Sequence, residues 1–331
     1  MQELKKLGFI LHEYINPKPT LNPFVELGSV ISIFKVLKKI NPDILHLITL
    51  KPYIYGGIIN RLFLKKPTVI SVAGLGLIVS KGLKASIIKS VVIFFMKLSF
   101  KQDKLKVIVQ NNTDKNFLTS NKICESNKII LIKGSGVNLS KYTYSDENTD
   151  EFICTFASRL IIEKGVNEFI EAANNLVKFN MKFWIVGDKD PNNNNSISIE
   201  DLMIKRNNPN IHFLGHRSDI NEIFKQSNVI VYPSYYGEGL PKVLIEAAAC
   251  GRPIITTNHP GCKDAINNMT TGYLCPIRDS VSIVKNILLL YRNDSKRKEF
   301  GKAARKFAEA NFDVSAVVKK HMEIYQSIEL K

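Results

Sequence analysis

The sequence predicts an α/β protein built from two parallel sheets. Short runs rich in β-branched and aromatic residues alternate with stretches in which apolar residues recur every three or four positions. This alternation is typical of parallel strands joined by helices. It runs through both halves of the chain, on either side of a polar segment, and 331 residues suffice for two domains.

In the N-terminal half, helices are expected between short strands. The expected strands are 8–11, 44–47, 68–72, 107–109 and 129–132. One helix is expected at about 23–39, with Asn22 as its N-cap and Pro23 in its first turn. A second helix is expected at about 83–100.

The C-terminal half repeats the pattern. Strands are expected at 152–156, 182–186, 211–214, 229–232, 253–256 and 272–274, and helices at 166–179, 220–225, 241–250, 281–291 and over the C-terminal stretch. The polar segment 142–150 is the best linker candidate. We therefore expect two Rossmann-like domains, 1–145 and 146–310, facing across a cleft where ligands bind at the strand ends, and a C-terminal helix 311–331 that packs back towards the first domain.

Positive charge is concentrated in the N-terminal half. Residues 1–145 contain 22 Lys and Arg against 7 Asp and Glu, and the whole chain has a formal net charge of +16. This asymmetry favours an anionic partner such as a membrane surface or phosphates, although a lysine-rich solvated surface would have the same composition. No zinc-finger or RNA-recognition motif accompanies the lysines, so we expect no nucleic-acid partner.

The segment 83–106 combines an apolar body with lysines, as in helices that lie in the headgroup layer. The alternative is a helix packed on the sheet with Ile87, Val91 and Phe94 in the core. The first interpretation predicts a cytoplasmic protein held on the inner face of the plasma membrane. No apolar run approaches the roughly 18–20 residues that cross a bilayer, the N-terminus does not resemble a signal peptide, and five scattered cysteines fit a reducing compartment.

Two carboxylates and two glycines follow the strand expected at 229–232. Gly237 and Gly239 permit close backbone approach to a ligand, and the N–H groups at the start of the next helix attract anions. Glu238 can accept hydrogen bonds from sugar hydroxyls. Glu246 lies in an otherwise apolar helix, where a carboxylate needs a hydrogen-bonding partner such as a ribose. A well-capped helix with an incidental glutamate is the alternative.

Cations and a glycine follow other expected strands. Arg159 and Lys164, after the strand at 152–156, can clamp a diphosphate and stabilise it as a leaving group. A solvated basic turn is the alternative for this pair. Gly187 and Arg217 lie where a base and a ribose would rest.

Together these segments resemble the retaining family 4 glycosyltransferases of the GT-B fold. The matching pieces are FASRLIIEKG, VGD, LGHRSDI, EGLPKVLIE with its E-x7-E spacing, and ACGRPIITT. The earlier pieces HLITLKPYIYGG, VAGLG and KGSGVN resemble the branch that builds bacterial surface polysaccharide or lipid-linked oligosaccharide. The resemblance implies transfer of a hexose or N-acetylhexosamine from a nucleotide sugar, a UDP-sugar by analogy, to a polyprenyl-diphosphate-linked or other glycan acceptor, without metal or cofactor.

The resemblance also implies residue roles. It places Arg159 and Lys164 on the diphosphate, Glu246 on the ribose, and Glu238 with Gly239 and Leu240 around the donor sugar. On the acceptor side it points to the loop of Gly74 and Gly76, where this sequence lacks the histidine of many members; His46 is the nearest alternative. Compared with the doubly wound pattern of the family, roughly 50–60 residues are absent at the start of this sequence. We therefore expect an N-terminal domain without its first strands.

Two other functions stay open. A nucleotide-sugar epimerase shares the two-domain architecture, and a non-catalytic nucleotide-binding protein would result if the shortened N-terminal domain were inactive. The E-x7-E segment and the Arg159–Lys164 pair favour the transferase over the epimerase.

Overall fold

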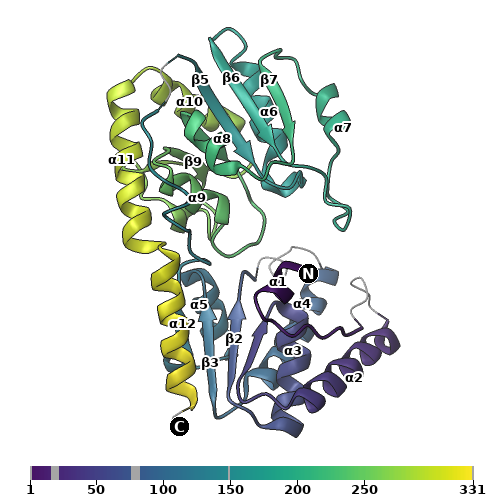
Figure 1. The fold of residues 1–331 in the computed structure, drawn as a ribbon. Helices are drawn as coiled ribbons and strands as arrows, with labels where there is room; N and C mark the ends of the chain where they lie inside the picture. The colour runs from purple at the N-terminus through teal and green to yellow at the C-terminus, as the bar shows by residue number, and fades with distance from the viewer. Residues whose placement is uncertain (1, 16–21, 76–82, 148–149, 330–331) are drawn as a thin grey trace.

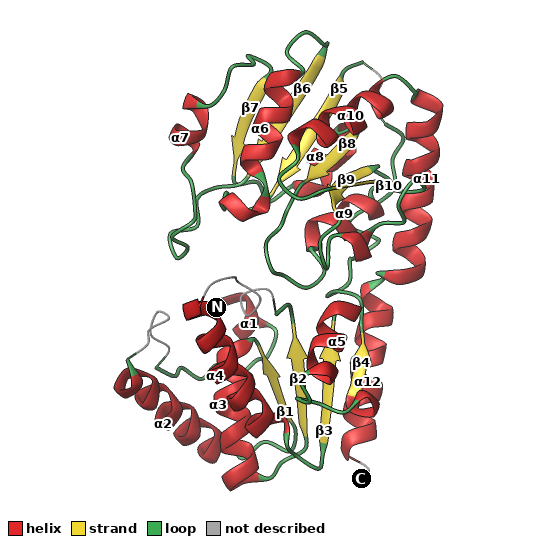
Figure 2. Cartoon of the chain, turned by 180° about the vertical axis from the view of Figure 1, so that it is seen from behind, coloured by secondary structure: helices red, strands yellow, loops and turns green. Residues whose placement is uncertain are grey.

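The chain forms two α/β units stacked end to end, as a computed structural model shows for residues 2–15, 22–75, 83–147 and 150–329 (Figure 1). The N-terminal unit contains α1 (Gln2–Lys6), α2 (Pro23–Ile40), β1 (Leu45–Ile48), α3 (Leu50–Ile59), a π-helical turn (Asn60–Leu64), β2 (Thr68–Val72), α4 (Leu83–Phe100), β3 (Leu105–Val109), α5 (Asn112–Ser120) and β4 (Ile129–Leu131). The helices α3 and α4 pack together, and α2 lies against α3 (Figure 2).

All four strands of the N-terminal sheet are parallel and lie in the order β1-β2-β3-β4. The strand expected at 8–11 is wrong: this segment follows a turn at Gly8 and forms no strand. Phe9 and Ile10 are 59% and 83% exposed. A short apolar run becomes a strand only where another strand pairs with it, and none of the described strands does so here.

The C-terminal unit contains β5 (Phe152–Ala157), α6 (Val166–Asn175), β6 (Met181–Val186), α7 (Ile199–Ile204), β7 (Ile211–Gly215), α8 (Ile220–Gln226), β8 (Val229–Tyr232), α9 (Lys242–Ala249), β9 (Ile254–Thr257), β10 (Gly272–Cys275), α10 (Ser280–Tyr291) and α11 (Asp294–Asn311). Its six parallel strands lie in the order β10-β9-β8-β5-β6-β7. The strand order reverses beside β5, and open sheets bind ligands at such a reversal.

The expected strands other than 8–11 are confirmed to within two residues at each end. Asn22 caps α2 by accepting a hydrogen bond from the backbone N–H of Phe24, as expected. The expected helix 166–179 is shorter, because α6 ends at Asn175. The short helices α3, α5 and α7 were not predicted from the sequence.

The last helix, α12 (Val314–Glu329), joins the two units along one side (Figure 1). At its start, the backbone of Val137 accepts from the Val314 N–H (3.1 Å) and donates to the Phe312 carbonyl (2.7 Å). Further along α12, Val317, Ile324 and Ile328 pack against a small cluster of buried residues on the N-terminal sheet. No helix of the described residues is long and apolar enough to span a bilayer.

The loop that follows β2 is tied to the start of α5 by a buried carboxylate. Asp114 is 6% exposed, and its side chain accepts hydrogen bonds from the Asn111 side-chain amide (2.9 Å) and the Leu75 backbone N–H (3.3 Å). Burial raises the pKa of Asp114 to about 6, although the bonds from Asn111 and Leu75 oppose the shift; the charge of Asp264 in the C-terminal unit adds to it.

The raised pKa of Asp114 predicts a pH-dependent stability. The carboxyl has a pKa of about 3.9 when unfolded, so the folded state binds the proton more tightly. The stability from protonated Asp114 is complete below pH 3.9 and is lost as the pH rises through about 6. Urea titrations would give the unfolding free energies of the wild type and of Asp114→Asn. The wild-type value minus the variant value should fall by about 2–3 kcal/mol between pH 4 and pH 7. A difference independent of pH would contradict this.

Candidate active site

A cavity of about 670 Å³ opens at the carboxyl ends of β5 and β6. The turns that follow these strands form its walls, because parallel strands end at the same edge of a sheet. Four residues predicted from the sequence line it together: Arg159, Gly187, Arg217 and Glu246. The side chain of Val243, near the start of α9, lies on the same wall.

Gly187 is required by the packing of two turns. Its φ of +138° is unfavourable for other residues, and a Cβ atom would lie 1.8 Å from the Ser158 carbonyl oxygen. The turn after β6 therefore lies directly on the turn after β5. The close approach of the two turns therefore requires glycine at position 187, with or without a bound ligand.

Among the described residues, the exposed guanidinium groups of Arg159 and Arg217 each pair with one aspartate. The Arg159 guanidinium is 58% exposed and lies 2.5 Å from the Asp190 carboxylate. Arg217 binds Asp219 through two nitrogens, at 2.8 and 2.5 Å. Exposed ion pairs contribute little to stability, so both guanidinium groups can exchange a carboxylate for an anionic ligand at small cost.

Glu246 on α9 is nearly buried and has a partner within the chain. Burial raises the pKa of its carboxyl, while a hydrogen bond from the Tyr142 hydroxyl and the charge of Lys242 oppose the shift. The Lys242 Nζ lies 3.8 Å from the carboxylate. Tyr142, in the linker, was not singled out from the sequence. It supplies a hydrogen bond that the buried carboxylate needs, and Glu246 still faces the cavity.

Lys164 and Glu238 form an ion pair beside the cavity, outside its lining. The Lys164 side chain is 6% exposed, and its Nζ lies 2.5 Å from the Glu238 Oε1. The Tyr232 hydroxyl donates to the same oxygen at 2.8 Å. Burial lowers the pKa of Lys164 and the Glu238 carboxylate opposes this; the positive charge of Arg159 lowers it further, which places the two cations within electrostatic reach.

Residues 237–240, here called the glycine loop, touch the N-terminal unit. The Gly239 N–H donates to the Ala73 carbonyl (3.0 Å), and the Leu240 N–H donates to the Gln110 Oε1 (2.9 Å). These amides, expected to face a ligand, therefore already have partners. A Cβ atom at Gly74 would lie 2.5 Å from the Glu238 carbonyl carbon, so this acceptor-side candidate lies against the loop. Gly76 lies outside the described residues.

His46 does not line the cavity. Its Nδ1 lies 2.7 Å from the Tyr325 hydroxyl on α12, and its Nε2 lies 2.7 Å from the Ser71 Oγ on β2. Burial and the neighbouring His321 lower its pKa. Both ring nitrogens hydrogen-bond to residues of the sheet and of α12. These contacts hold His46 between the sheet and α12, away from the residues that line the cavity.

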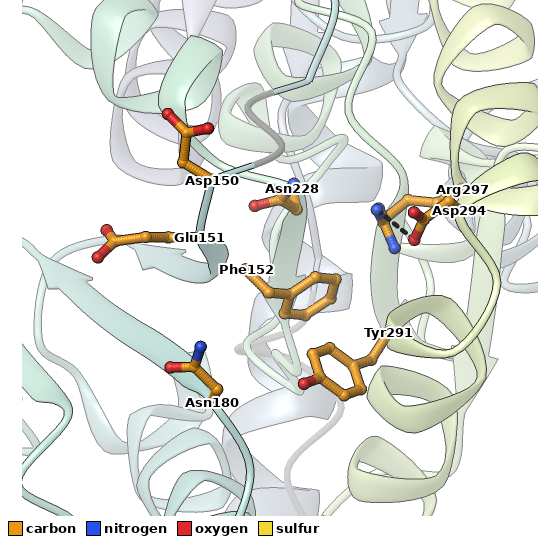
Figure 3. A pocket seen from close by; sticks show the side chains of 8 residues that line it. All are labelled: Asp150, Glu151, Phe152, Asn180, Asn228, Tyr291, Asp294 and Arg297. Carbon is orange, nitrogen blue, oxygen red and sulfur yellow. Dashed lines mark hydrogen bonds and ion pairs between the residues drawn. The ribbon is translucent and has the colours of Figure 1, made fainter.

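A smaller hollow of about 190 Å³ lies at the opposite edge of the C-terminal sheet (Figure 3). There Arg297 is paired with Asp294 (2.8 Å) and with Glu147 of the linker (2.5 Å). Phe152 and Tyr291 make an edge-to-face contact beside it. The paired guanidinium holds the linker on the unit. Within the described ranges, no group of three or more His, Cys, Asp or Glu could hold a metal ion.

Two families match most of the chain. Residues 144–307 match the glycosyl transferases group 1, and residues 2–111 match a glycosyl transferase 4-like family. The chain is 31% identical to the N,N'-diacetylbacillosaminyl-diphospho-undecaprenol alpha-1,3-N-acetylgalactosaminyltransferase of Campylobacter jejuni, over 99% of this chain and 88% of the relative. It is 26% identical to the capsular polysaccharide biosynthesis glycosyltransferase CapM of Staphylococcus aureus, over 98% and 87%.

Solved structures share the arrangement of both units. HepE of Anabaena, solved in complex with UDP, matches with a TM-score of 0.81 at 17% identity, over 98% of this chain and 88% of HepE. Sucrose-phosphate synthase of Thermosynechococcus elongatus matches with a TM-score of 0.79 at 19% identity, over 95% and 82%. The chain therefore belongs to the group 1, or family 4, glycosyltransferases and has their GT-B fold.

Proposed function

We propose that this enzyme moves a hexose or N-acetylhexosamine from a UDP-sugar to a polyprenyl-diphosphate-linked acceptor, with retention of the anomeric configuration. The observation that carries the proposal is the shared cavity of Arg159, Arg217 and Glu246 at the strand ends. Two relatives support the substrate classes: the Campylobacter jejuni enzyme, and the UDP-Gal:alpha-D-GlcNAc-diphosphoundecaprenol alpha-1,3-galactosyltransferase of Escherichia coli, 28% identical over 91% of this chain and 79% of the relative.

In this proposal the C-terminal unit holds the donor. Arg159 exchanges Asp190 for the diphosphate, and the charge of Lys164 lies near Arg159. Glu246 accepts hydrogen bonds from the ribose. Gly187 and Arg217 border the base and ribose. As the bond between the sugar and the diphosphate breaks, negative charge grows on the diphosphate, and fixed cations stabilise that charge. Glu238, anchored by Lys164, contacts the donor sugar.

The nucleotide specificity predicts a selective thermal shift. A ligand that binds only the folded state raises the melting temperature, and the rise is larger the further the ligand concentration exceeds its Kd. UDP and UDP-sugars should raise the Tm, and GDP and ADP at equal concentration should raise it less. A panel in which another nucleoside diphosphate gives the largest shift would reject UDP as the donor nucleotide.

The donor roles predict a loss of transfer in two variants. Arg159→Ala should lower kcat about 10²-fold or more, because it removes a charge that stabilises the leaving diphosphate. Glu246→Ala should raise the KM of the donor. Transfer from a UDP-sugar to a polyprenyl-diphosphate-linked acceptor would be measured, with circular dichroism to confirm folding.

Matched surface substitutions serve as controls for those variants. Arg292→Ala and Glu222→Ala change exposed residues outside the cavity, and both variants should transfer at the wild-type rate. Wild-type activity in Arg159→Ala or Glu246→Ala would remove the role of that residue. A wild type that only epimerises free UDP-sugar, or binds UDP without transfer, would refute the transferase.

The N-terminal unit carries the surface that we propose for an anionic membrane, at its inner, cytoplasmic face. Helix α4 packs on the sheet through buried Met96 and Phe100, while Ile87, Val91 and Phe94 are 61%, 48% and 57% exposed. The alternative in which these three residues form core is wrong, because they are exposed. Exposed lysines accompany them on α4 and just after it: Lys89, Lys97, Lys101 and Lys104 are partly or largely accessible. Apolar side chains and lysine stems together suit the headgroup layer.

Membrane binding should depend on both charge and apolar contact. The protein should sediment with vesicles that contain anionic phosphatidylglycerol and be released by high salt, because each lysine contributes up to about 1 kcal/mol near anionic lipid. Lys97→Glu/Lys101→Glu and Phe94→Asp should each weaken binding. Lys319→Glu/Lys320→Glu, at exposed positions of α12, is the matched control. Binding that ignores lipid charge and salt would contradict the electrostatic contact.

A further inference from the structure

The glycine loop is held from two sides by different parts of the chain. On the side of its own unit, the Glu238 carboxylate binds the Lys164 ammonium (2.5 Å) and the Tyr232 hydroxyl (2.8 Å). On the other side, the loop contacts the N-terminal unit through its backbone. The N–H groups of Gly239 and Leu240 donate to the N-terminal unit. The position of Glu238 therefore depends on contacts with both units.

A side chain at Gly239 would displace the Gln110 amide from its hydrogen bond with the loop. A Cβ atom at Gly239 would lie 2.0 Å from the Gln110 Oε1 and 2.8 Å from its Cδ. On the opposite flank, a Cβ atom at Gly261 would lie 1.7 Å from the Gly239 carbonyl oxygen. The loop is thus enclosed between Gln110 on one flank and Gly261 on the other. A small displacement of either residue would shift the loop.

The backbone of Gln110 is held in place by the elements on either side of it. It follows the last residue of β3 directly, and its neighbour Asn111 caps α5 by accepting from the Asp114 N–H (2.8 Å). Its backbone is therefore set by a buried strand and a capped helix. The side chain is half-buried, and its carbonyl oxygen is the acceptor for the Leu240 N–H.

We infer that Gln110 is a positioning residue for sugar transfer: by holding the Gly239–Leu240 backbone it sets the orientation of Glu238 towards the donor sugar. The inference rests on the proposed function, in which Glu238 contacts the sugar. Gln110 lies outside the donor cavity and acts through the loop. Misplacement of a catalytic group by about 1 Å can lower a rate about 10²-fold.

The test uses two substitutions that keep the approximate length of the side chain. Gln110→Met keeps the length of the side chain and removes the acceptor, whereas Gln110→Glu keeps an acceptor oxygen. Gln110→Met should lower kcat about 10-fold or more with an unchanged Kd for UDP, because the Arg159 and Glu246 cavity is untouched. Gln110→Glu should retain activity within about threefold. Gln226→Met, at an exposed position on α8, is the control and should match the wild type.

Amide hydrogen exchange of the glycine loop supplies a readout that does not need activity. The Leu240 amide should exchange faster in Gln110→Met and at the wild-type rate in Gln110→Glu. Unchanged kcat in Gln110→Met overturns the inference, and unchanged kcat with faster exchange reduces the contact to a structural one. If the wild type transfers no sugar, the proposed function fails, while the exchange rates still report whether Gln110 holds the loop.

Discussion

The carboxyl edges of the two parallel sheets meet at the backbone of Gly239, and the arrangement of the site depends on that contact. A parallel sheet presents its ligand-binding loops at one edge only, so two such sheets form a shared site only if those edges face each other. Here they approach until Ala73 and Gln110 accept hydrogen bonds from the glycine loop. Backbones can approach so closely only where glycine replaces larger residues, which explains Gly74; at Gly239 a Cβ atom would collide with the Gln110 side chain.

The buried charges of the C-terminal unit hold loops in place, and the exposed ones remain free to bind. Lys164, Arg252 and Arg297 are each at most 5% exposed. Their partners are the glycine loop for Lys164 and the linker for the two arginines. Burying such charges is costly unless they are paired, as Lys164 and Arg297 are, or hydrogen-bonded, as Arg252 is to Ser145, so we expect these contacts to be rigid. Arg159 and Arg217, by contrast, have exposed guanidinium groups, 58% and 42% accessible, which can exchange a carboxylate for an anionic ligand.

The surface of the N-terminal unit combines positive charge with exposed apolar side chains. It carries most of the excess positive charge of the chain, and it exposes apolar side chains on α4 and also on α2, where Phe24 is 82% exposed. Neither property is needed to pack the sheet, whose core lies beneath α3 and α4. Both are suited to a lipid surface that delivers an acceptor bound to a long apolar chain. In the arrangement that we propose, one unit meets the membrane and the other holds the nucleotide.

The sequence by itself determined the strands that recur between helices, the cap at Asn22 and the candidate residues that follow the strands, because these depend on local periodicity and on position within a repeating unit. It did not determine that residues 8–11 lack a pairing strand, or that Ile87, Val91 and Phe94 face outward. It also contained no motif for Tyr142 beside Glu246, or for Gln110, which bonds Leu240 across 130 positions of chain. Only the tertiary structure decided these contacts, because they depend on how separate sheets and helices stack, and no local pattern encodes a partner so distant in the chain.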